Sequence, residues 1–255
     1  MPEAKELEFF SYHNHLANPG FGSYLQHFSE ASKTCAVGEA TASYFWTRTH
    51  SRWGILPSGF QTEIPRVVHQ HLGGELRLIV TLRHPVKRVI SAYLHYLAVG
   101  EIPPHTGFDQ AIKYGGGGDM GFYACHLRNW LEHYPLEQIK VLILETDIQL
   151  RPVETLASVC RFLSVSNHGL SQEHTQKVIF RGPQRAINEN GVYVPGDGRH
   201  ADKKDASYMN KGGQNWHRII SAEQLHQLHD IFLPDVKDLD NMLGTNLAQS
   251  WGFPA

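Results

Sequence analysis

The hydrophobic residues of this chain form two short runs and several stretches with helical spacing. Residues Leu76–Leu82 have the composition of a strand that lies centrally in a parallel sheet, and Ile139–Leu144 is a second such run. Val86–Leu97 follows the first run, and its apolar residues recur at intervals of three and four, which predicts an amphipathic helix. Pro85 suits the start of this helix, because the N–H that proline lacks would have no partner in a first turn.

The same spacing predicts further helices, with stop signals at Pro135 and Gly244. The expected helices span Met120–His133, Val153–Leu163, Ala222–Phe232 and Val236–Leu243, and a shorter third strand is expected at Cys35–Val37. Strands that alternate with helices predict the α/β fold class, with a central parallel sheet flanked by helices. A length of 255 residues suits a single domain that covers residues 1–255.

Two stretches rich in glycine interrupt this pattern. Residues from Phe180 to Asn215 contain many Gly, Asn, Asp and Arg residues without periodicity, which predicts a long functional or mobile loop. Residues Gly115–Gly118 predict a turn or flexible joint. A phosphate-binding loop is a poorer interpretation of these four glycines, because no Lys and no Ser or Thr follow them in the required order.

Charge and cysteine content narrow the choice of partner and compartment. The net charge is −2, so no global positive field attracts the chain to nucleic acid or to an anionic membrane, and any polyanion must be held locally. The three cysteines form no CxxC pair, which argues against a disulfide framework and favours a reducing, cytoplasmic location. No apolar stretch approaches the ~18 residues that span a bilayer. The oligomeric state is left open.

Histidine is abundant, with 17 residues, and several histidines lie in close pairs. The pairs are His13 with His15, His69 with His71, and His226 with His229. Since no cysteine or clear third ligand accompanies them, the sequence predicts no metal site.

The strongest local signal lies between the first strand and its helix. Arg83 follows the strand directly, where ligands of α/β sheets bind, and the helix N-terminus beside it favours an anion. The guanidinium of Arg83 can hold a phosphate through two hydrogen bonds, and Ser91, two helical turns further on, could donate its hydroxyl to the same anion. From these residues alone, the preferred interpretation is that Arg83 and Arg88 pair with carboxylates on the surface.

The segment Arg83–Tyr93 resembles the 3′-phosphate-binding motif of sulfotransferases that use 3′-phosphoadenosine 5′-phosphosulfate (PAPS), in which an Arg and a Ser lie eight positions apart. Four other segments resemble this family in the same order, mainly its heparan sulfate N- and 3-O-sulfotransferases. They are Lys5–Phe10, Gly38–Phe45, Tyr123–Leu131 with the following Tyr134-Pro135, and Lys211-Gly212-Gly213 with Trp216. The matches are spread from Lys5 to about Trp251, which is nearly the whole chain.

The resemblance implies a P-loop-like sulfotransferase fold that uses PAPS as its co-substrate and needs no metal. It assigns donor binding to five residues, Arg83, Ser91, Lys211, Gly212 and Gly213. Glu6 matches the catalytic glutamate of the family and is the first choice for the base. His126 is the second choice, as a base or as a contact to the acceptor, and its alternative is a helix histidine packed beside Trp130.

The chain also departs from the family pattern. Ala40 and Ala42 stand where the heparan sulfate enzymes carry a Lys and a Pro. The first motif of the family is a Gly-rich strand, loop and helix that binds the 5′-phosphosulfate some tens of residues before the glutamate. Only five residues precede Glu6, so we expect the chain to lack this N-terminal segment.

The expected function is sulfuryl transfer from PAPS to a hydroxyl or amine of a small-molecule or glycan acceptor. The resemblance favours a glycan, while a lipid or a secondary metabolite stays open as the acceptor. A non-catalytic binding module of the same fold is the alternative from another class. A kinase or other P-loop transferase is a weaker alternative, because the chain has no Gly-x-x-x-x-Gly-Lys-Ser/Thr motif.

Overall fold

A computed structural model gives the fold of the chain. It describes residues 6–32, 36–47, 58–103, 105–168, 185–187, 193–195 and 220–254. The chain divides into two compact units, each built from two stretches of sequence. The first unit comprises Met1–Arg83 and Tyr123–Lys177, and the second comprises His84–Phe122 and Val178–Ala255.

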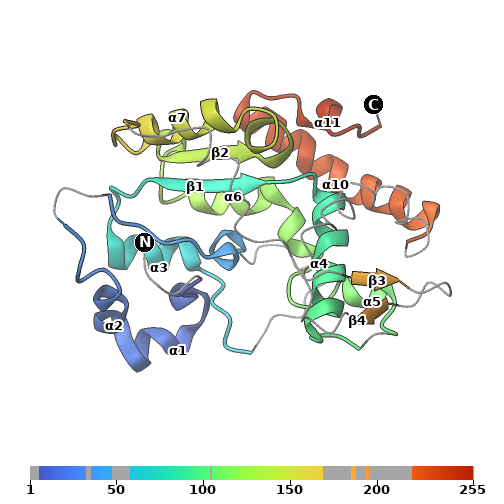
Figure 1. Cartoon of the computed structure of the whole chain (residues 1–255), viewed down its shortest axis with the longest axis horizontal. Helices are drawn as coiled ribbons and strands as arrows, with labels where there is room; N and C mark the ends of the chain where they lie inside the picture. The colour runs from blue at the N-terminus through green and yellow to red at the C-terminus, as the bar shows by residue number, and fades with distance from the viewer. Residues whose placement is uncertain are drawn as a thin grey trace. The chain divides into compact units, whose positions relative to one another are not determined.

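A parallel sheet forms the centre of the first unit. Strands β1 (Leu78–Leu82) and β2 (Ile139–Ile143) lie side by side and run in the same direction (Figure 1), with Leu78 opposite Ile139 and Leu82 opposite Ile143. Both predicted strands are therefore confirmed, each one or two residues shorter than expected. Because the strands are parallel and in register, the residues that follow them meet at one edge of the sheet.

Helices and short helical turns surround this sheet in the first unit. The α-helices are α1 (His13–His15), α2 (Phe21–Gln26), α3 (Ile64–Leu72), α6 (Tyr123–Leu131) and α7 (Pro152–Phe162). The shorter turns are η1 (Phe9–Ser11), η2 (Leu16–Gly20), η3 (Ala42–Phe45), η5 (Leu136–Gln138) and η6 (Leu144–Ile148). Helices α6 and α7 match the predicted helices, whereas α3 was not predicted.

The second unit contains α4 (Pro85–Val99), α5 (Phe108–Ala111), η4 (Asp119–Gly121), α10 (Ala222–Leu243) and α11 (Leu247–Ser250). The apolar face predicted for the first of these helices is confirmed, because all five of its residues are buried. They are Val86, Val89, Ile90, Tyr93 and Leu97. Burial of this face, rather than helix propensity, holds α4 in place.

Helix α10 corrects the prediction of two separate helices at the C-terminal end. It continues through Pro234, and its buried stripe passes the proline without interruption, from Leu228 and Phe232 to Val236. The helix begins with a capping box in which Ser221 and Gln224 satisfy each other's backbone N–H groups. Packing of the continuous stripe therefore outweighs the hydrogen bond that proline removes.

The glycine-rich stretches also differ from expectation. Within the range expected to be a structureless loop, β3 (Arg185–Ile187) and β4 (Tyr193–Pro195) form an antiparallel pair. The expected strand at Cys35–Val37 is wrong for its described residues, since Ala36 and Val37 are exposed and belong to no strand.

The four glycines at 115–118 form a clamped turn in the second unit. Gly115 and Gly116 have φ of 51° and 72°, values that suit glycine, and residues 116–118 are buried. The Tyr96 hydroxyl donates to the Gly115 carbonyl (3.1 Å), and the Arg88 guanidinium donates to the Gly117 carbonyl. The prediction of a turn is confirmed, but that of a flexible joint is wrong.

Candidate active site

Arg83 is the cation at the carboxyl edge of the parallel sheet. It follows β1 directly and is half-buried, and its carbonyl accepts a hydrogen bond from the buried hydroxyl of Tyr123 on α6 (2.7 Å). Burial lowers the pKa of the Arg83 guanidinium, and the negative charge of Glu145 opposes this effect. Glu145 lies just beyond β2, at the same edge. A half-buried arginine fixed at this edge suits an anionic ligand.

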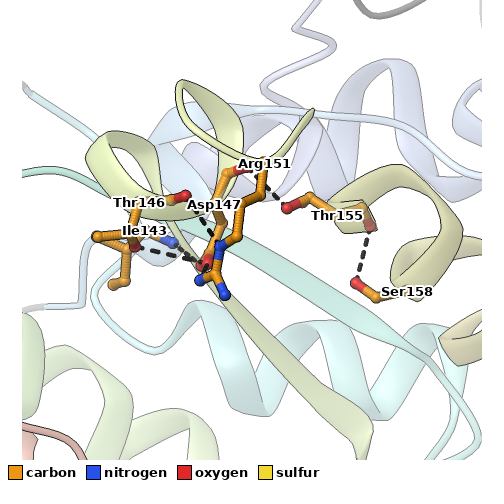
Figure 2. Close-up of polar contacts among 6 residues, drawn as sticks. All are labelled: Ile143, Thr146, Asp147, Arg151, Thr155 and Ser158. Carbon is orange, nitrogen blue, oxygen red and sulfur yellow. Dashed lines mark hydrogen bonds and ion pairs between the residues drawn. The ribbon is translucent and has the colours of Figure 1, made fainter. Parts of the chain in front are cut away.

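A hydrogen-bonded clasp holds the turn that carries Glu145 (Figure 2). The Asp147 carboxylate accepts from the backbone N–H of Ile143 at the end of β2 (2.7 Å) and pairs with Arg151 (2.9 Å). The Thr155 hydroxyl on α7 donates to the Asp147 carbonyl (2.7 Å). The clasp therefore fixes the chain from β2 through η6 to α7, and sequence reasoning missed it.

Helix α4, which follows Arg83 in the sequence, belongs to the second unit. His84 caps α4, because its Nδ1 atom accepts from the backbone N–H of Val86 (3.2 Å). Its ring is buried and lies against Phe253 and His229, with ring centroids 5.1 and 5.7 Å away. Ser91 is half-buried on α4 at the predicted place, two turns into the helix. The joint action of Arg83 and Ser91 on one phosphate stays a prediction.

Glu6 lies in a segment with unusual backbone geometry. Glu6 and Glu8 have φ of 59° and 52°, in the left-handed region that residues other than glycine rarely adopt. The following Phe9 and Phe10 are buried, and the backbone N–H of Glu8 donates to the Thr41 hydroxyl (3.3 Å). Contacts on its C-terminal side therefore hold this segment in place and leave the Glu6 side chain exposed.

Glu39 holds the two side chains that contact the Glu6 segment, those of Thr41 and Tyr44. Its carboxylate accepts from the hydroxyls of Thr41 and Tyr44, each at 2.9 Å. Burial, together with the charge of Glu39, raises the pKa of both Tyr24 and Tyr44 far above the ordinary value. Glu39 was not among the predicted site residues. The sequence does place two hydroxyl donors, Thr41 and Tyr44, two and five positions after Glu39. Only the folded segment shows that both of them donate to the Glu39 carboxylate.

His126 is buried on α6, with only 1% of its surface exposed. Its Nδ1 atom accepts from the backbone N–H of Thr47 (3.3 Å), and the Thr47 hydroxyl lies 3.2 Å from the same atom. Phe45 of η3 packs edge-on against the His126 ring, with the centroids 5.8 Å apart. His126 is therefore firmly held, which agrees better with the packed alternative than with an exposed base.

These contacts link most of the predicted residues of the first unit. The Glu6 segment bonds to η3, η3 packs through Phe45 on His126, and α6 bonds through Tyr123 to Arg83. Lys211, Gly212 and Gly213 lie outside the described residues. In the described part of the chain, no three His, Cys, Asp or Glu side chains gather as metal ligands. No helix described there is long and apolar enough to cross a membrane.

The parallel sheet and the half-buried Arg83 at its carboxyl edge define an α/β protein with a candidate anion-binding site. The profile of the family called sulfotransferase domain matches residues 39–240. Because this range is more than half of the chain, the chain belongs to the sulfotransferase domain family.

Curated relatives agree with the family and with the predicted resemblance. Human bifunctional heparan sulfate N-deacetylase/N-sulfotransferase 2 is 23% identical over 177 residues, which are 64% of this chain and 18% of that protein. Heparan sulfate glucosamine 3-O-sulfotransferase 6 of Mus musculus is 38% identical over 90 residues, 31% of this chain and 25% of the relative. The human protein of the same name is 34% identical over 107 residues, 38% of this chain and 26% of the relative. The chain thus matches about a quarter or less of each relative's length.

A solved structure shows the same fold. A sulfotransferase from Alicyclobacillus acidocaldarius matches with a TM-score of 0.58 at 22% identity, covering 98% of this chain and 87% of that one. The predicted sulfotransferase fold is therefore confirmed.

Proposed function

We propose that this chain transfers a sulfuryl group from PAPS to a hydroxyl or amine of an acceptor, with a glycan as the acceptor class. The observation that carries the proposal is Arg83, a half-buried cation at the carboxyl edge of the sheet within a chain of the sulfotransferase family. Such a cation fits the 3′-phosphate of the donor because a phosphate oxygen pair matches the guanidinium.

Donor binding is assigned to residues that the sequence predicts. Arg83 and Ser91 bind the 3′-phosphate, and Lys211 with Gly212 and Gly213 contacts the nucleotide through its charge and backbone. The negative charge of Glu145 favours the charged form of Arg83, and the Asp147 clasp holds the turn that carries Glu145.

Glu6 is proposed as the base. The bound donor supplies a sulfuryl group on a phosphate leaving group. The acceptor oxygen or nitrogen forms the new bond to sulfur, its proton passes to the Glu6 carboxylate, and the bond from sulfur to the 5′-phosphate oxygen breaks to leave 3′-phosphoadenosine 5′-phosphate. The left-handed backbone at Glu6 supports this role, because strained residues concentrate at functional sites.

The acceptor class rests on the names of the curated relatives, two of which are heparan sulfate glucosamine 3-O-sulfotransferases. We also propose that the two units together form one sulfotransferase domain, since the family profile runs across all their boundaries. A cytoplasmic location and the lack of a nucleic-acid partner stay predictions.

Isothermal titration tests the donor site. The wild-type chain should bind 3′-phosphoadenosine 5′-phosphate more tightly than AMP, which lacks the 3′-phosphate. Arg83→Ala should weaken the binding of 3′-phosphoadenosine 5′-phosphate by about 10- to 100-fold, which is the effect of losing a charge-assisted contact. It should leave AMP binding unchanged. Arg161→Ala, which removes an exposed arginine of α7, is the matched control. Equal affinity of the wild type for both nucleotides would contradict the proposal.

A transfer assay with labelled donor and a panel of glycan, lipid and small-molecule acceptors tests the chemistry. Glu6→Gln should lower transfer by about 100-fold or more and spare nucleotide binding. Nucleotide binding without transfer to any acceptor would favour the non-catalytic binding module. Loss of transfer and binding together in Glu6→Gln would make Glu6 a structural residue.

A further inference from the structure

The side chains of His126, Thr47 and Asn129 form a hydrogen-bonded group. Thr47 and His126 are each 1% exposed. The Asn129 side-chain amide donates to the Thr47 hydroxyl oxygen (2.5 Å), one turn of α6 after His126. The Thr47 backbone N–H and hydroxyl both face the Nδ1 atom of His126 (3.3 and 3.2 Å).

The directions of these bonds follow from the atoms. A backbone N–H can only donate, so Nδ1 of His126 must present its lone pair. Because Nδ1 is then an acceptor, the Thr47 hydroxyl must donate its proton to it, while the Thr47 oxygen accepts from Asn129. A neutral imidazole with Nδ1 as acceptor carries its proton on Nε2.

This arrangement bears on which residue removes the proton from the acceptor. Protonation of His126 would have to occur at Nδ1, because Nε2 already carries a proton. It would expel the Thr47 backbone N–H, which cannot become an acceptor, and place a charge at a position that water does not reach.

We propose that Thr47 and Asn129 are positioning residues that lock His126 as the neutral tautomer with its proton on Nε2, so that His126 serves as an N–H donor and not as the base. The catalytic part of this inference rests on the proposed function, and it leaves Glu6 as the base. The tautomer itself rests only on the hydrogen bonds of the first unit.

Nitrogen-15 NMR of the full chain at neutral pH reads the tautomer directly, with no substrate present. The His126 signals are assigned among the 17 histidines as those lost in His126→Gln. We expect an unprotonated shift at Nδ1 and a protonated shift at Nε2. A protonated Nδ1, alone or together with Nε2, would overturn the proposal.

Variants of Thr47 separate positioning from simple packing. Thr47→Val keeps the shape and the backbone N–H but removes the hydroxyl. We expect Nδ1 of His126 to stay unprotonated in this variant, because the backbone N–H still donates to it, and we expect its shift to move because one of its two donors is lost. Thr47→Ser should restore the wild-type shifts, and Asn129→Leu should resemble Thr47→Val. Unchanged shifts in Thr47→Val would refute the role of the hydroxyl. Because the spectra need no nucleotide, a locked tautomer in a chain that fails to bind 3′-phosphoadenosine 5′-phosphate would contradict the proposed function alone.

Discussion

The Asp147 clasp offers a graded test of what holds the carboxyl edge of the sheet. Three substitutions remove different parts of it (Figure 2). Arg151→Ala removes the ion pair, Asp147→Asn keeps an oxygen for the Ile143 N–H but removes the charge, and Asp147→Ala removes both.

The structure ranks these losses. The Arg151 and Asp147 side chains are 63% and 23% exposed, so their ion pair contributes at most about 0.5 kcal/mol to the free energy of unfolding. The bond from the Ile143 N–H to a carboxylate is charge-assisted, and Ile143 is buried, so its loss costs about 1.5–3 kcal/mol. We therefore expect the free energy of unfolding to fall by about 0.5 kcal/mol in Arg151→Ala, about 1 kcal/mol in Asp147→Asn and about 2–3 kcal/mol in Asp147→Ala.

Urea unfolding, followed by tryptophan fluorescence and circular dichroism, measures these differences. In a chain of this size, Asp147→Ala should lower Tm by about 4–12 °C. Glu154→Gln, which changes an exposed carboxylate on α7, is the matched control and should have no effect beyond about 0.5 kcal/mol. If Arg151→Ala destabilises the chain as much as Asp147→Ala, the ion pair and not the backbone bond holds the turn, and the reasoning fails.

Two further predictions concern packing and pH. A Cβ at Gly121 would lie 2.6 Å from a ring atom of the buried Phe232, so Gly121→Ala should cost about 1–3 kcal/mol in urea unfolding. Phe232→Leu should relieve this clash, and strictly additive effects in the double variant would show that the two residues do not meet. The buried Tyr134 hydroxyl donates to the Gly73 carbonyl (3.0 Å), and burial raises the pKa of Tyr134 to about 12. The stabilising effect of the raised pKa is present below pH 10 and is lost as pH rises toward 12. Between pH 8 and 11, the free energy of unfolding should therefore fall by about 1.4 kcal/mol more in the wild type than in Tyr134→Phe. An equal or smaller loss in the wild type would contradict the raised pKa.

The parts of the fold that the sequence predicts are those encoded by local periodicity. Both strands of the sheet and the helix after Arg83 follow from apolar runs and helical spacing, and all were found. The predicted break between Phe232 and Val236 is wrong, because buried residues on both sides of Pro234 form one continuous stripe. A helix that packs along its whole length tolerates a proline that would end an isolated one.

The site was less predictable, because its residues are defined by contacts across the sequence. Arg83 could be found from its position after a strand, but the register of β1 on β2 was needed to bring Glu145 to the same edge. Thr47 lies in no local motif, and Glu39 lies in the segment Gly38–Phe45 without a predicted role. Their roles appear only once they meet Tyr44 and His126. Such long-range partners cannot be inferred from spacing in one sequence.

Such contacts also bear on the choice between the two candidate bases. The resemblance to the family offers both Glu6 and His126 as candidates, and a histidine titrates closer to neutral pH than a glutamate does. Composition and motif therefore give no reason to reject His126. The structure supplies one, because the backbone N–H of Thr47 occupies the atom that would have to accept the proton. Glu6, exposed at the end of a segment anchored through Glu8, meets no comparable objection.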